Sequence, residues 1–231
     1  MQTSNSSQLH VRKILPWSVL FLLLTTLPYV MAVLNTPPDK VFLGALVNSE
    51  DFSTFISAMR QGQTGQWLFQ FTFSAEPWQP QLMHFTYILL GKVASLVGGD
   101  LVIWFHIYRF ATAVFALWML LLWVRTLWPG QPQLQFTAWF LCGFGSGIGW
   151  LVAIAGLPAP TTDLTGPEWT VFMALFHTPH YALGLALEIL LFCSVIKLIR
   201  DGTGWLWTAV GTLASLASSL TYVYHIPITG L

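Results

Sequence analysis

The sequence has few charged residues: Lys, Arg, Asp and Glu together make up 8% of its 231 residues, against about a quarter in soluble domains. A soluble surface carries about 25–35% charged residues, so a water-soluble domain is excluded. The net charge is zero and the longest basic run is Arg12-Lys13, which argues against nucleic acid as a partner, because phosphate binding requires clustered Lys and Arg. The two cysteines, Cys142 and Cys193, lie in apolar stretches and are interpreted as small packing residues.

Long apolar windows are abundant instead. A bilayer core about 30 Å thick requires about 20 apolar residues per helix, and five windows are long enough: 14–35, 101–124, 136–157, 179–199 and 204–224. We therefore predict an all-α fold, a polytopic transmembrane helical bundle of about five spans. Residues 14–231 are expected to form one membrane domain after a cytoplasmic tail, 1–13, whose first eight residues are expected to be disordered. The first window lacks a cleavage signal and is interpreted as an anchor.

The distribution of charge decides whether the short apolar segment 81–97 spans the membrane. If it lies flat, one face collects five basic residues: Arg12, Lys13, Arg125, Lys197 and Arg200. The other face then collects seven of the nine acids: Asp39, Glu50, Asp51, Glu76, Asp100, Asp163 and Glu168. Because basic residues favour the inside, we predict a multi-pass protein of the plasma (cytoplasmic) membrane with its N-terminus inside and a long outer loop.

The outer loop is predicted to carry two surface helices, 51–61 and 81–97. In the first, the apolar residues Phe52, Phe55, Ile56 and Met59 recur at the spacing of one helical face. Between the helices lies a loop, 63–79, rich in Trp, Phe and Gln.

The order of these parts resembles the GT-C superfamily of polytopic membrane glycosyltransferases, in particular the bacterial branch of aminoarabinose and dolichyl-phosphate-mannose-type transferases. The stretches that carry the resemblance are Asp51-x3-Phe55-x4-Arg60, Gly65-Gln66-Trp67, Glu76-Pro77, the helix 80–97, and the span from Arg109 to Arg125. The resemblance implies transfer of a sugar from a polyprenyl-phosphate donor to an acceptor on the outer face. Family members have at least seven spans, so the chain looks like an N-terminal part, and a missing C-terminal half or further membrane subunits are expected partners beside the lipid bilayer.

The resemblance assigns the catalytic role to Asp51, as base or as ligand of a divalent metal ion; no other cofactor is expected. Donor phosphate would be bound by Arg60, Lys92 and His180, because Arg binds two oxygens at once and Thr178-Pro179 predicts a helix start whose free N–H groups attract anions. With Asp51, His180 is also the candidate metal ligand. Where the family usually has a second acid, the sequence has His177 and His180.

Further candidates are Glu50, Glu76, His177, Arg109 and Glu188. The last two lie within spans, where a charge is costly and requires a partner, a cavity or a headgroup. The glycines at 143–149 allow either close helix packing or a local break.

Two other functions fit the sequence. One is a non-catalytic membrane module that binds lipid-linked glycans or serves as a partner subunit, in which Asp51 caps a helix and Arg60 reaches headgroups. The other is a small transporter built around Glu188 and Arg109.

Overall fold

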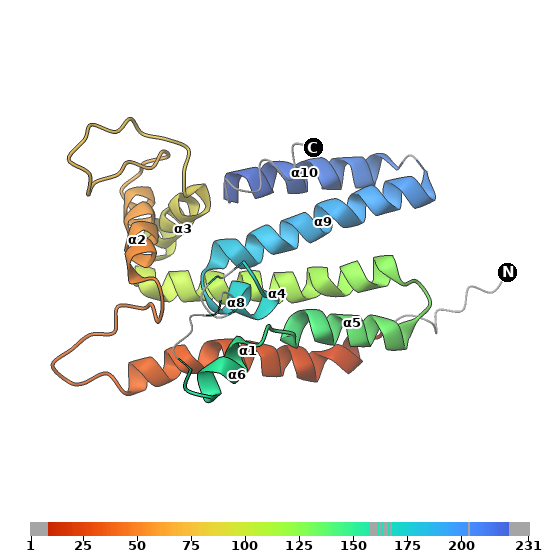
Figure 1. Ribbon diagram of the computed structural model, residues 1–231. Coiled ribbons are helices and arrows are strands. Elements are labelled where there is room, and N and C mark those ends of the chain that lie inside the picture. Colours follow the sequence, from red (N-terminus) through yellow and green to blue (C-terminus); the bar gives the residue numbers. More distant parts are fainter. Residues whose placement is uncertain are drawn as a thin grey trace.

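The structure is a computed structural model that describes residues 9–157, 161, 163, 166, 168–202 and 204–221. The tail 1–8, expected to be disordered, lies outside the described residues. Within them the chain is helical and forms no strand beyond a single bridge between Phe69 and Gln81. The helices are α1 (Val11–Leu34), α2 (Ser49–Gln63), α3 (Phe85–Val97), α4 (Leu101–Leu127), α5 (Pro132–Phe144), α6 (Gly149–Ile154), α8 (Val171–Phe176), α9 (Pro179–Asp201) and α10 (Trp205–Thr221) (Figure 1).

Three helices are long and apolar enough to cross a membrane: α1, α4 and α9. They correspond to three of the five predicted windows, and each extends two or three residues past its window at one end. The all-α fold is therefore confirmed, and three such helices suggest a multi-pass membrane protein. The remaining windows contain shorter helices. α10 has 17 described residues and α5 has 13, fewer than the about 20 that a bilayer core requires.

The window 136–157, expected to be one span, is broken in two. α5 ends before Gly145, whose backbone is extended, and α6 begins at Gly149. The carboxylate of Asp163 accepts a hydrogen bond of 2.9 Å from the Gly149 N–H, and a Cβ at Gly149 would lie 2.3 Å from that carboxylate. This approach requires glycine, so the break accounts for at least one glycine of the run.

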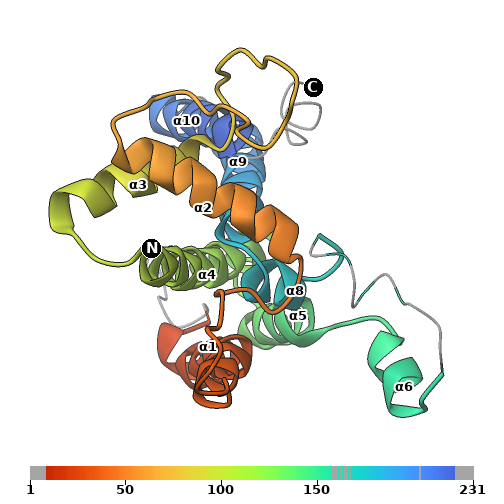
Figure 2. The same ribbon diagram turned by 90° about the vertical axis from the view of Figure 1, so that its left-hand side faces the viewer.

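The long helices pack side by side into a bundle (Figures 1 and 2). α4 packs most extensively on α9, and α9 on α10. A core of apolar side chains fills the space between them; Phe21 and Trp139 are its largest fully buried members, and the Trp139 indole N–H donates to the Leu117 carbonyl at 3.3 Å.

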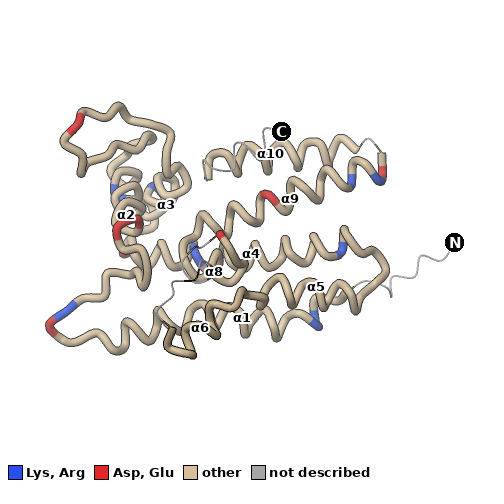
Figure 3. Tube along the Cα trace, in the orientation of Figure 1, with Lys and Arg blue, Asp and Glu red and all other residues tan. Residues whose placement is uncertain are grey.

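α2 and α3 form a separate pair across one end of the bundle (Figure 2). They touch backbone to backbone, because a Cβ at Gly62 would lie 2.0 Å from the Ile88 carbonyl oxygen and one at Gly91 only 1.9 Å from the Met59 carbonyl oxygen. The predicted apolar face of α2 is turned inward, with Phe52, Phe55 and Met59 buried. The start of α1 and the ends of α4 and α9, which carry the five grouped basic residues, lie at the opposite end of the bundle (Figures 1 and 3).

Candidate functional site

A cavity of about 520 Å³ opens at the start of α2. Its walls come from the first turns of α2, from the aromatic loop that follows α2, and from the residue just before α3. The lining residues are Glu50, Asp51, Thr54, Phe55, Phe71, Phe73 and His84. Two carboxylates and one imidazole thus face a space with three phenyl rings, a combination of polar and aromatic groups typical of a small-molecule site.

One residue that lines this cavity, His84, and one that bonds to a lining residue, Asn48, have a strained backbone. Asn48 (φ 53°) and His84 (φ 50°) are the two described non-glycine residues in the left-handed region, which is costly for residues with a Cβ. Asn48 donates a side-chain hydrogen bond to the Asp51 carboxylate, and His84 lines the cavity with Asp51. Such strain tends to gather at functional sites, so the backbone supports this cavity as the candidate site.

Asp51 influences the protonation of two histidines. Burial lowers the pKa of His84 below its ordinary value, and the negative charge of Asp51 partly opposes this. Burial likewise lowers the pKa of His177, again opposed by Asp51 and by Glu168. Both imidazoles are therefore held neutral near pH 7, and the structure brings Asp51 into electrostatic reach of each of them.

His180 lies behind the cavity wall. Its Nδ1 is 2.7 Å from the Tyr87 hydroxyl, and its ring meets that of Phe55 at a centroid distance of 5.0 Å. Phe55 in turn stacks on Tyr87 at 4.5 Å. Burial raises the pKa of Tyr87 well above its ordinary value, so its phenol stays protonated. His180 therefore supports the aromatic wall instead of lining the cavity.

The other predicted phosphate ligands lie outside the cavity. Arg60 is exposed in the last turn of α2, nine residues from Asp51 and hence about 13 Å along the helix. Lys92 donates to the Gly65 carbonyl at 3.0 Å and lies over the Trp67 ring at 4.1 Å. Glu76 is exposed in the loop.

The predicted metal ligands Asp51 and His180 do not belong to a metal-binding cluster. In the described part of the chain, no group of three or more His, Cys, Asp or Glu side chains gathers closely enough to hold a metal ion.

Arg109 is 2% exposed and finds its partners within the bundle, where it donates to neutral groups. It bridges three helical segments, donating to backbone oxygens, to a hydroxyl and to an imidazole. These acceptors are the Thr25 O (3.2 Å), the Leu175 O (3.4 Å), the Thr26 Oγ1 (3.4 Å) and the His106 Nδ1 (3.4 Å).

Glu188 lines a different cavity, of about 220 Å³, between α8 and α9, together with Glu168 and Tyr181. It is half-buried. Neither Arg109 nor Glu188 lines the Asp51 cavity, so the structure separates the two residues on which the transporter hypothesis rested from the predicted catalytic carboxylate.

Sequence reasoning missed His84 and the aromatic pair of Phe71 and Phe73 as site residues. The signal available for His84 was its place directly before an apolar helix. Its left-handed backbone depends on tertiary packing and leaves no trace in the sequence.

The chain matches no family model, no curated protein and no solved structure.

Proposed function

We propose that the protein is a membrane glycosyltransferase of GT-C type, which transfers a sugar from a polyprenyl-phosphate donor to an acceptor hydroxyl. The observation that carries the proposal is the cavity in which Asp51 and His84 face the phenyl rings of Phe71 and Phe73. The α2–α3 end of the bundle faces the outside in this proposal, since the basic residues gather at the opposite end. α2 and α3 then lie along the membrane surface.

Asp51 acts as general base in the proposed reaction. Its carboxylate takes the proton of the acceptor hydroxyl as the oxygen attacks the anomeric carbon, and the bond from that carbon to the phosphate oxygen breaks with inversion. The hydrogen bond from Asn48 orients the carboxylate and leaves it able to accept a proton. Neutral His84 supplies a hydrogen-bond donor for a sugar hydroxyl, and the phenyl rings provide flat apolar walls for the sugar ring.

Arg60 and Lys92 fit the role of phosphate ligands only for a donor that extends from the cavity across the surface of α2 and α3. Their distance from the cavity favours a second candidate function, a module that holds lipid-linked glycan without transferring it. In that case the cavity binds the sugar and Asp51 accepts hydrogen bonds from its hydroxyls.

One experiment separates the two functions. The purified chain is reconstituted with radiolabelled polyprenyl-phosphate sugars and a pool of acceptor lipids, and both retained donor and transferred label are measured. We expect Asp51→Asn to lower transfer by about 10²–10⁴-fold, the usual contribution of a general base, while donor binding persists. Asp39→Asn, which changes an exposed carboxylate in the same loop, is the matched control. Donor retention without transfer in the unmodified chain would favour the binding module.

A further inference from the structure

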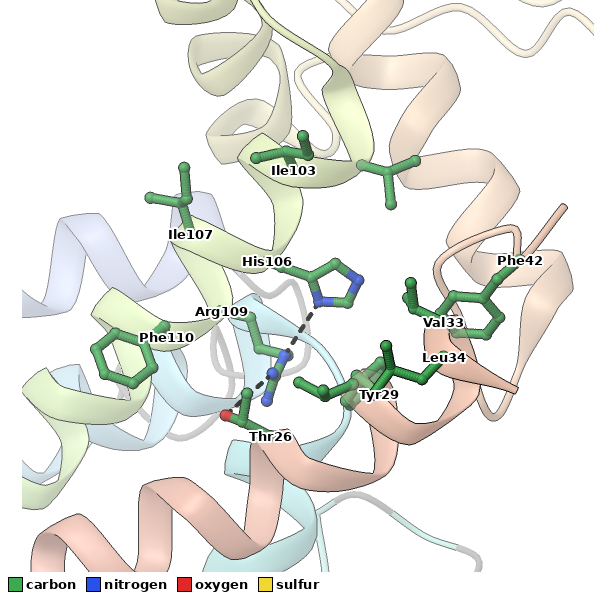
Figure 4. A pocket seen from close by; sticks show the side chains of 12 residues that line it. Thr26, Tyr29, Val33, Leu34, Phe42, Ile103, His106, Ile107, Arg109 and Phe110 are labelled. Carbon is green, nitrogen blue, oxygen red and sulfur yellow. Dashed lines mark hydrogen bonds between the residues drawn. The ribbon is translucent and has the colours of Figure 1, made fainter. Parts of the chain in front are cut away.

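A second and larger concavity lies between α1 and α4, on the side of the bundle and toward α2 and α3 (Figure 4). Its volume is about 580 Å³, within the range of about 300–1,000 Å³ for ligand sites. We call it the α1–α4 groove. Its lining residues are Thr26, Tyr29, Val30, Val33, Leu34, Phe42, Val102, Ile103, His106, Ile107, Arg109 and Phe110.

The walls of the groove are apolar and open. Val33 is 59% exposed on α1, and Ile103 is 61% exposed on α4. Both helices are long and apolar enough to cross a membrane, so the groove opens toward lipid and not toward water. Hydrocarbon chains are the molecules that meet such a surface in a bilayer.

The floor of the groove carries a permanent positive charge. Arg109 points from the groove floor toward His106, one turn nearer the α2–α3 end (Figure 4), as helical side chains lean toward the N-terminus of their helix. Its four hydrogen bonds are long, 3.2–3.4 Å. They leave one of the five guanidinium N–H groups without an acceptor among the described residues. The contacts of Arg109 within the described residues include no carboxylate.

An uncompensated cation in a low-dielectric setting is costly, and an anion that reaches it removes much of that cost. A ligand for this groove therefore needs two parts: an apolar chain for the walls and an acidic group for the floor. Charge and apolarity together select an anionic lipid over a neutral one.

We propose that the α1–α4 groove binds an anionic phospholipid, with one acyl chain along Val33 and Ile103 and the phosphate at the Arg109 guanidinium. The phosphate accepts a charge-assisted hydrogen bond from the remaining guanidinium N–H. This lipid site is separate from the Asp51 cavity and does not rest on the proposed sugar transfer, because the two concavities share no lining residue.

The test measures lipid retained by the purified chain in detergent micelles doped with equal amounts of phosphatidylglycerol and phosphatidylcholine, by native mass spectrometry. We expect retention of phosphatidylglycerol over phosphatidylcholine, and a loss of about tenfold for Arg109→Gln, the change that follows from losing one hydrogen bond to a charged group. Ile103→Trp fills the groove without touching the buried core and should give a similar loss. Leu23→Trp, equally exposed on α1 at 59% but outside the groove, is the control and should retain the lipid.

Equal retention of the two phospholipids would overturn the proposal, as would equal effects of Ile103→Trp and Leu23→Trp. Preferential retention of a polyprenyl phosphate added at the same concentration would overturn the assignment to phospholipid. If Arg109→Gln does not fold, Ile103→Trp and its control decide the matter alone.

Discussion

The Tyr87 hydroxyl and the His180 Nδ1 lie 2.7 Å apart in a buried contact that joins the end-lying pair α2–α3 to the start of α9. The stacked rings of Phe55 and Tyr87 extend this contact to the wall of the Asp51 cavity. This polar contact therefore links the cavity wall to a helix that is distant in sequence.

Removing that contact should loosen α3 from α9. Tyr87→Phe keeps the ring stack but leaves the His180 nitrogen buried without its phenol, so we expect a loss of about 1–3 kcal/mol. Thermal unfolding in detergent measures the change. A double-mutant cycle with His180→Phe should show coupling; additive effects would mean that the 2.7 Å contact contributes no stability.

Gly91, one of the two glycines at the crossing of α2 and α3, should tolerate no side chain. Gly91→Ala places a Cβ against the Met59 carbonyl, so the helices must separate, and we expect a loss of more than about 2 kcal/mol, as in other overpacked sites. Gly143→Ala is the matched control, because its Cβ would meet Phe21 at an ordinary 3.6 Å and alanine favours a helix by about 0.5–1 kcal/mol. Equal melting temperatures for the two variants would contradict the close crossing.

Stability should fall as the pH drops below the ordinary histidine pKa of 6.5. The folded-state pKa values of His84 and His177 are lowered by burial, so the unfolded chain binds more protons between the lowered and the ordinary values. Unfolding is therefore favoured progressively as the pH falls from 6.5 toward the folded-state pKa values. Melting temperatures from pH 7 to 5 measure this.

The double variant His84→Gln, His177→Gln should flatten the acid side of that profile. Asp51→Asn should steepen it, because the Asp51 charge opposes the lowering at both histidines. A slope unaffected by the double variant would show that other groups carry the acid sensitivity.

Substitutions of Asn48 should affect stability and function differently. Asn48→Gly relieves the strain of the left-handed conformation but removes the hydrogen bond to Asp51. We therefore expect a free energy of unfolding within about 1 kcal/mol of that of the original chain. Sugar transfer or glycan binding should be reduced. Asn48→Ala keeps the strain and loses the bond, and should be less stable by about 1–2 kcal/mol. Full function in Asn48→Gly would show that the bond does not orient the carboxylate.

Much of the architecture could be read from hydropathy. The windows around Ile14, Leu101 and Pro179 predicted α1, α4 and α9, because predominantly apolar stretches of about 20 residues have few alternatives to a helix. The apolar residues Phe52, Phe55 and Met59 predicted α2 because their spacing follows the 3.6-residue period of a helix, which also identifies the buried face.

Tertiary contacts decided the rest. The break at Gly145 depends on Asp163, a residue outside the apolar window that caps α6 through Gly149, so hydropathy alone could not reveal it. Asp51 was predicted from the order of motifs, whereas His84 entered the cavity through a backbone conformation that only the packing of α2 and α3 sets. Arg60 and Asp51 belong to one sequence motif, which suggested that they act together. In the structure nine residues of helix separate them.

The bonds of Arg109 also order events during synthesis. Its acceptors lie 84 residues earlier, at Thr25, and 66 residues later, at Leu175. When α4 leaves the ribosome, α1 is already available to bind the guanidinium but α8 has not yet been made. The full set of hydrogen bonds that Arg109 makes can therefore form only after α8 has been synthesised.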